Sequence, residues 1–156
     1  MSEEKSKEEL EREAEEAREK AEEEKEYKIE DAEINSDNKE YMLQSIKDKA
    51  TWVLAYASER LLSDKDLIMQ VAKVDGQVLY YASKELRDDK DVVLTAVTNK
   101  WLIVKYASKR LRSDKDIAIA ALSQSKDAAK YLTDEIKQDP EVDAIINPPA
   151  VENNQQ

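Results

Sequence analysis

The stretch Tyr81-Ala82-Ser83-Lys84-Glu85-Leu86-Arg87-Asp88-Asp89-Lys90-Asp91-Val92-Val93-Leu94 recurs along the chain, and this recurrence indicates a repeat protein. Copies begin at Tyr56, Tyr81 and Tyr106, a weaker copy begins at Tyr131, and successive tyrosines are 25 residues apart. A fixed period of this length is typical of stacked helical repeats, in which each unit buries its apolar side against its neighbours. We therefore predict an all-α fold in which tandem helical hairpins form a short α-solenoid.

An aspartate marks the start of one helix in every unit. The column consists of Asp64, Asp89, Asp114 and Asp139. The next column holds three lysines and then Pro140, and proline is favoured at the first position of a helix. Each aspartate is therefore a predicted N-cap. The helices that follow are predicted at about 65–74, 90–98, 115–124 and 140–146.

A second helix is predicted in each unit, at about 51–62, 77–87, 101–112 and 126–137. Val53, Ala57 and Leu61 follow helical spacing there, and the tyrosine column lies beside this stripe. Ser125 is a predicted cap, and Gly76 is the predicted left-handed residue after a helix. The column of small hydroxyl residues is interpreted as a tight contact between helices. It consists of Ser58, Ser83, Ser108 and Thr133.

Residues 1–33 are predicted to form a charged single helix or arm, because residues 1–26 hold 13 Glu and 6 Lys or Arg without Gly or Pro. The predicted i,i+4 ion pairs are Glu3–Lys7, Glu8–Arg12, Glu16–Lys20 and Glu24–Lys28. Four residues of the arm follow a 4-3-4 spacing, and they are Leu10, Ala14, Ala17 and Ala21. This spacing could support weak self-association, although alanine makes a poor coiled-coil seam. The residues expected to dock the end of the arm onto the repeats are Tyr27, Ile29, Ala32 and Ile34.

Residues 34–146 are predicted to form the helical-repeat domain, with about four units. Residues 41–46 resemble residues 92–97 and are assigned to a degenerate first unit, with Ser36 or Asp37 as the cap of its helix. Pro148 and Pro149 end the last helix, so residues 147–156 are predicted to be a disordered tail.

Composition excludes several classes of function. The net charge of −11 argues against nucleic-acid and anionic-membrane binding. Without Cys or His, the usual zinc, haem and iron–sulfur sites lack ligands, and a single Gly cannot form a phosphate loop. We therefore expect no metal and no cofactor. No apolar run is long enough for a signal peptide or a membrane span, so we expect a cytoplasmic protein.

The segment 81–97 resembles a short helical repeat of a family that is known as a domain of unknown function. That repeat runs approximately Trp-Ala-Leu-x-Tyr-Ala-Ser-x-x-Leu-x-x-Asp-Lys-Glu-Val-Val-Leu-x-Ala-Val, and the resemblance covers roughly residues 41–146. Trp52 matches the family tryptophan nearly in place, whereas Trp101 is displaced. The resemblance implies tandem arrays in larger proteins and implies no activity.

Five residues are candidates for binding a partner, and they are Trp52, Trp101, Arg87, Arg112 and Lys137. Tryptophan is enriched in binding hot spots, but it is also an ordinary residue at the end of a core. The two arginines and Lys137 could form a basic strip with Lys90 and Lys115. Their aspartate neighbours favour a solvated, salt-bridged face instead.

These features predict a non-catalytic helical-repeat scaffold that mediates protein–protein interaction. One alternative is nucleic-acid or nucleotide binding along one face of the solenoid, where the tyrosine column would stack on bases. Another is an enzyme that relies on carboxylates alone, because no histidine is present to activate the serine column. We expect a protein partner and no enzymatic activity.

Overall fold

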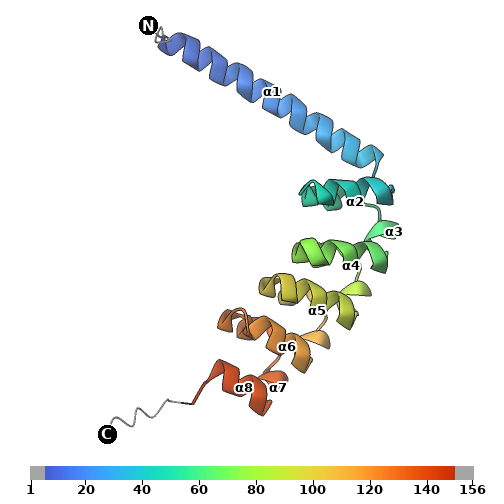
Figure 1. Cartoon of the computed structure of the whole chain (residues 1–156), viewed down its shortest axis with the longest axis vertical. Coiled ribbons are helices and arrows are strands. Elements are labelled where there is room, and N and C mark those ends of the chain that lie inside the picture. Colours follow the sequence, from blue (N-terminus) through green and yellow to red (C-terminus); the bar gives the residue numbers. More distant parts are fainter. Residues whose placement is uncertain (1–5, 150–156) are drawn as a thin grey trace.

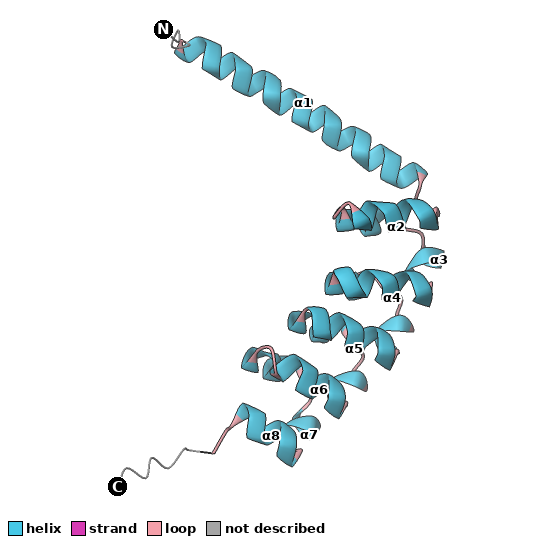
Figure 2. Ribbon diagram, viewed as in Figure 1, coloured by secondary structure: helices cyan, strands magenta, loops and turns pink. Residues whose placement is uncertain are grey.

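The computed structural model describes residues 6–149, and within that range every regular element is helical. A long helix, α1 (Lys7–Ile34), extends away from a curved stack of shorter helices (Figure 1). The stack contains α2 (Lys39–Lys47), α4 (Lys65–Val74), α5 (Lys90–Asn99), α6 (Lys115–Leu122) and α8 (Pro140–Ile146). The predicted all-α fold is confirmed, and Figure 2 shows the same arrangement by secondary structure.

The second half of each unit is not the continuous helix that was predicted. It consists of a 3₁₀ helix, a break in the helix, and a short corner turn. The pairs are η1 (Thr51–Tyr56) with α3 (Glu59–Leu62), η2 (Gly76–Tyr80) with η3 (Leu86–Asp88), η4 (Trp101–Tyr106) with η5 (Leu111–Ser113), and η6 (Lys126–Tyr131) with α7 (Asp134–Lys137).

The serine column explains this break. Ser58 has an extended backbone (φ −63°, ψ 155°), and its hydroxyl accepts a hydrogen bond from the Leu61 amide at 3.2 Å. The amide of Ser58 donates a hydrogen bond of 2.7 Å to the carbonyl of Ser36, a residue that lies before α2. In the later units, the equivalent amide-to-carbonyl hydrogen bonds run from Ser83 to Leu62, from Ser108 to Arg87, and from Thr133 to Arg112. The interpretation of this column as a tight helix contact is therefore wrong, because these residues interrupt the helix and bind the preceding unit.

The aspartate caps are confirmed. Asp64 accepts from the Leu67 amide at 3.0 Å, and Asp89, Asp114 and Asp139 cap α5, α6 and α8 in the same way. Pro140 stands in the first turn of α8, as predicted. Ser125 caps η6, also as predicted. The cap of α2 is Asn38 rather than Ser36 or Asp37, because the Asn38 side chain accepts from the Tyr41 amide.

One continuous apolar core runs along the stack, from Ala32 at the end of the arm to Val142 in α8. Spacing for an α-helix predicts burial of Val53 and Leu61, and both are buried. The same spacing does not predict burial of the adjacent column, the residue that follows Val53 and its equivalents in later units. A 3₁₀ helix turns every three residues, so it brings these further side chains inward. The buried residues of that column are Leu54, Leu79 and Val104.

The arm docks through fewer residues than predicted. Ala32 is buried and Ile29 is half-buried, but Tyr27 is 70% exposed and Ile34 is 75% exposed. Residues three apart share one face of a helix, so Ile29 and Ala32 can reach the repeats together. Tyr27 and Ile34 are seven residues apart, so they share another face of α1, and both stay largely exposed.

Ion pairs along the arm differ in part from the prediction. Glu24 pairs with Lys28 at 2.6 Å, as predicted, whereas Arg12 pairs with Glu16 at 3.9 Å. Lys7 pairs with Glu11 at 3.6 Å. The predicted partner Glu3 lies outside the described residues, as do residues 150–156 of the predicted tail.

Gly76 does not have the left-handed conformation that was predicted, since no described glycine has a positive φ. Its role is close approach: a Cβ atom at this position would stand 2.4 Å from the carbonyl oxygen of Ala96 in the next unit. Its amide also donates to the Asn99 side chain at 2.9 Å. A larger residue would therefore push two units apart.

We expect Gly76→Ala to lower the free energy of unfolding by about 1–3 kcal/mol, the usual cost of overpacking. Urea titration followed by circular dichroism measures this change. The matched control is Lys126→Ala at the exposed position 50 residues later, which should change stability by less than about 0.5 kcal/mol. Equal stability of Gly76→Ala and the unaltered chain would contradict the close packing described here.

Candidate functional site

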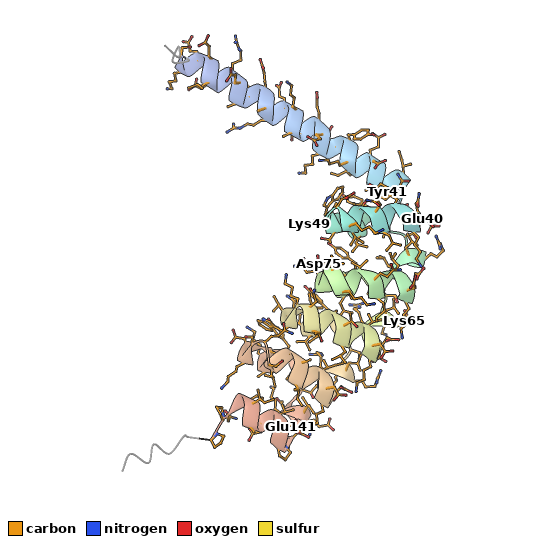
Figure 3. The ribbon with its side chains drawn as sticks, in the orientation of Figure 1. Glu40, Tyr41, Lys49, Lys65, Asp75 and Glu141 are labelled. Atoms are coloured by element: carbon orange, nitrogen blue, oxygen red, sulfur yellow. The ribbon has the colours of Figure 1, made fainter. Side chains whose placement is uncertain are left out.

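A ladder of lysines joins successive units at the N-terminal ends of the stacked helices. Lys90 contacts Asp114 at 2.9 Å and Asp116 at 2.7 Å, both in the following unit. The other rungs are Lys39 with Asp64 and Asp66, Lys65 with Asp89 and Asp91, and Lys115 with Asp139 and Glu141. Lys65 lies on the outer edge of the curve, whereas Asp75 lies at the opposite ends of the helices (Figure 3). We call this row the lysine ladder.

The ladder holds its groups in their charged forms. Hydrogen bonds from Lys39 and from the Leu67 amide keep the pKa of Asp64 below its ordinary value. Burial opposes this effect at Asp89 and Asp114, but the lysine and backbone hydrogen bonds together outweigh it, so the pKa of both is lowered. The aspartates raise the pKa of Lys65 and Lys90 by accepting hydrogen bonds from them. Lys90 and Lys115 therefore belong to a salt-bridged face.

The five candidate partner-binding residues do not meet in one place. Arg112 donates to the carbonyl of Tyr131 at 3.2 Å, and the Nε atoms of Arg87 and Arg112 are buried without a hydrogen-bond partner. Lys137 pairs with Asp134 at 3.0 Å. Trp101 is half-buried at the start of η4, where its amide donates to the Gln124 side chain. Trp52 lines a cavity between the arm and the first repeat.

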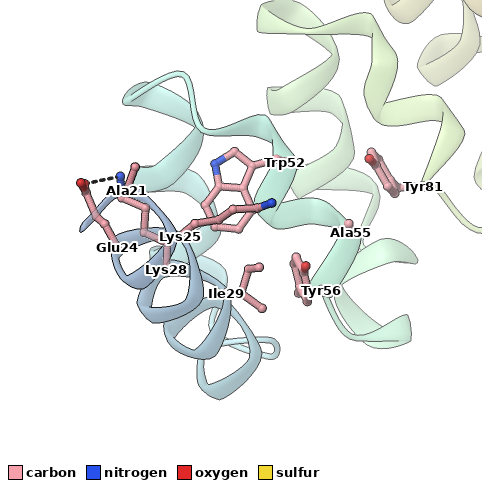
Figure 4. Close-up of a pocket in the computed structure, with 9 residues that line it drawn as sticks. All are labelled: Ala21, Glu24, Lys25, Lys28, Ile29, Trp52, Ala55, Tyr56 and Tyr81. Carbon is pink, nitrogen blue, oxygen red and sulfur yellow. Dashed lines mark hydrogen bonds and ion pairs between the residues drawn. The ribbon is translucent and has the colours of Figure 1, made fainter. Parts of the chain in front are cut away.

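That cavity, which we call the arm groove, has a volume of about 500 Å³ and lies between α1 and η1 (Figure 4). Ala21, Glu24, Lys25, Lys28 and Ile29 of the arm line one side. The other side is lined by Trp52, Ala55, Tyr56 and Tyr81. The groove therefore has an apolar floor and a charged rim on the arm.

Trp52 is 40% exposed, and its ring meets the Tyr56 ring edge to face at 6.1 Å between centroids. Ala55 occupies the position where later units have Tyr80, Lys105 and Lys130. A small residue at this position leaves space beside the tryptophan. The groove is thus specific to the first unit, and it can take an apolar side chain of a ligand against an aromatic wall.

Sequence reasoning missed a second exposed surface, which we call the lysine–tyrosine face. It consists of the exposed Tyr80, Lys105 and Lys130 with the half-buried Lys100 and Tyr106, and it follows η2, η4 and η6. Tyr80 is 56% exposed, and its ring meets the rings of Tyr81 at 4.9 Å and Tyr106 at 5.1 Å. The Lys105 ammonium stands 4.8 Å from the centroid of Tyr106. The signal that could have found this face is the tyrosine doublet at 80–81.

Two consecutive segments of the chain, residues 38–87 and 89–137, match the family described as Domain of unknown function (DUF4116). These segments cover more than half of the chain. The protein belongs to this family. No curated protein and no solved structure matches the chain. The DUF4116 match therefore gives a family without an activity.

Each DUF4116 segment contains two of the 25-residue units, and the structure shows a physical difference between alternate junctions. Asp88, which lies between the two segments, accepts hydrogen bonds from Ser108 and from Arg110. A similar clamp joins Asp37, Ser58 and Arg60, where Ser58 and Arg60 lie 50 residues before Ser108 and Arg110 and Asp37 lies 51 residues before Asp88. At the other junctions, serine and glutamate replace the clamp residues, at Ser63 with Glu85 and Ser113 with Glu135.

Among the described residues, no helix combines the length and the apolar character that crossing a membrane requires.

The lysine ladder predicts how stability depends on pH. Aspartates with a lowered pKa contribute stability above their unfolded pKa, and this contribution is lost as the pH falls through the folded value. Lysines with a raised pKa contribute stability below their unfolded pKa of 10.5, and it is lost as the pH rises through the folded value. Stability should therefore be constant near neutral pH and fall at both extremes. Urea midpoints across the pH range measure this.

The control for this experiment is the triple variant Lys65→Met, Lys90→Met and Lys115→Met. Removing the cations should flatten the alkaline loss and weaken the acid loss, because the backbone caps of the aspartates remain. Identical pH profiles for the variant and the unaltered chain would show that the ladder contributes nothing.

Proposed function

We propose that this DUF4116 protein is a non-catalytic helical-repeat scaffold that binds another protein through the arm groove. The observation that carries the proposal is the exposed Trp52 beside a cavity of about 500 Å³. A partly exposed tryptophan in a pocket with an apolar floor is a typical anchor of a binding hot spot. Tyr56 holds the indole from one side, so the aromatic wall exists before a ligand arrives.

The partner that fits is an amphipathic helix with basic residues along its edges. The groove runs beside α1, so a helix could lie against the arm and place one apolar side chain over Trp52. The described arm, Lys7–Ile34, carries 14 Asp or Glu and 6 Lys or Arg, a net charge of −8. That charge attracts basic edges and repels acidic ones.

Binding is a better match to this site than catalysis. Within the groove lining, Glu24 and Lys28 satisfy each other at 2.6 Å, and most of the remaining side chains offer apolar or aromatic contact area. Carboxylate catalysis would need two carboxyl groups facing one substrate, and the groove lining has one, Glu24. The absence of enzymatic activity and the cytoplasmic location both stay predictions from the sequence.

The substitution Trp52→Ala tests the proposal. Against a synthetic helical peptide of leucine and lysine with one apolar side, it should weaken binding by about 2 kcal/mol, or roughly thirtyfold, as expected for a tryptophan hot spot. Isothermal titration calorimetry at physiological salt gives the affinity. Trp52 is 40% exposed, so the variant should keep the fold.

The matched control is Trp101→Ala, which removes the other tryptophan from the equivalent end of η4. It should leave peptide affinity unchanged within about twofold, because Trp101 lies outside the groove. Equal affinities for the unaltered chain and Trp52→Ala, or equal losses for both tryptophan variants, would refute binding in the arm groove.

A further inference from the structure

Within the described residues 6–149, lysines on one side of the repeat stack form ion pairs, whereas those on the lysine–tyrosine face do not. Every lysine of the ladder contacts two acidic side chains of the following unit, so none of these lysines is left as an unpaired cation. Lys100, Lys105 and Lys130 of the lysine–tyrosine face form no ion pair within the described part of the chain. An acidic protein therefore keeps a row of free cations on one face, with exposed tyrosine beside them. Such a face is complementary to an acidic ligand.

The chain itself carries an acidic ligand of suitable form. Glu8, Glu15 and Glu22 are all exposed and stand seven residues apart on α1. Seven residues are two turns of helix, so these carboxylates form one row with a spacing of about 10.5 Å. The row is continued by Ile29, which lies seven residues after Glu22 and lines the arm groove, so the carboxylates extend this edge of the arm toward the N-terminus of α1.

The spacing of the lysines matches this row. Lys105 and Lys130 occupy the same position in two successive units, where η4 and η6 pack side by side. Packed helices lie about 8–10 Å apart, which is close to two turns along an α-helix. An acidic helix that crosses the units can therefore place one glutamate of a seven-residue row on each lysine. Its apolar stem atoms would cover Tyr80 and Tyr106.

We propose that the lysine–tyrosine face binds the acidic arm of a second copy of this chain. The arm cannot reach the face of its own chain, because Ala32 fixes its end at the first unit and the helix then points away from the stack (Figure 1). A reciprocal exchange of arms gives a closed two-fold dimer. This contact differs from the arm-to-arm seam through Leu10, Ala14, Ala17 and Ala21, which would bring together two helices of net charge −8.

Sedimentation velocity of the full chain tests the proposal. At an ionic strength of about 20 mM the protein should form a dimer, and at about 500 mM it should shift toward monomer, since exposed ion pairs are screened. The double variant Lys105→Glu and Lys130→Glu should weaken dimerisation at low salt by at least about tenfold, because it turns attraction into repulsion. The charge-matched control is Lys47→Glu with Lys73→Glu, on the exposed surfaces of α2 and α4, which should retain the dimer.

Mixing two variants with reversed charges, one in the arm and one in the lysine–tyrosine face, gives the decisive result. The arm variant Glu8→Lys, Glu15→Lys and Glu22→Lys should be monomeric alone, yet form a mixed dimer with the Lys105→Glu, Lys130→Glu chain. A monomer at every salt concentration, or failure of the two variants to associate when mixed, would overturn the proposal. So would tight binding of a single-stranded RNA that prevents self-association and is lost in Lys105→Glu, Lys130→Glu, because the face would then be a nucleic-acid site. None of these results depends on Trp52, so the arm groove is tested separately.

Discussion

A backbone hydrogen bond between successive units determines most of this architecture. The amide of a serine or threonine in each unit donates to a carbonyl of the unit before it, from Ser58 to Thr133. At Ser58 and Thr133 this residue has an extended backbone, and its amide is bonded to the preceding unit and not to a helix. The second segment of every unit is consequently divided into a 3₁₀ helix and a corner turn. Burial of the common core supplies the driving force, and this hydrogen bond fixes the register in which burial occurs.

The two edges of the stack differ in how strongly their side chains are constrained. Asp64, Asp89 and Asp114 are held by their roles as caps and by the lysine ladder, so the outer edge hardly varies between units. The 3₁₀ helices have no such constraint on their exposed positions. One column reads Ala55, Tyr80, Lys105 and Lys130, and its variation yields a groove at one end and a cationic face at the other. The exposed side chains of this column can therefore change along the array while the stacking contacts remain the same.

The sequence alone predicted the features that depend on local chemistry. An aspartate before proline identifies a cap, and a 25-residue tyrosine period identifies a repeat, because each involves neighbours in the chain or simple counting. The prediction failed where a residue acts on another unit. Ser83 looks like a helical residue until its partner Leu62 is known, and Gly76 looks like a turn until Ala96 is placed beside it. The arm groove combines arm residues with repeat residues that lie between 23 and 60 positions away, and no local pattern reveals it.

Amide hydrogen exchange followed by NMR shows whether this backbone hydrogen bond is present between every pair of units. Ser58, Ser83, Ser108 and Thr133 lie at breaks between helices, where amides usually exchange with solvent quickly. Because each amide is bonded to the preceding unit, all four should be protected about as strongly as the amides inside α5. The amide of Glu59, in the first turn of α3, provides an internal reference for fast exchange. Exchange of the four amides as fast as that of Glu59 would contradict the account.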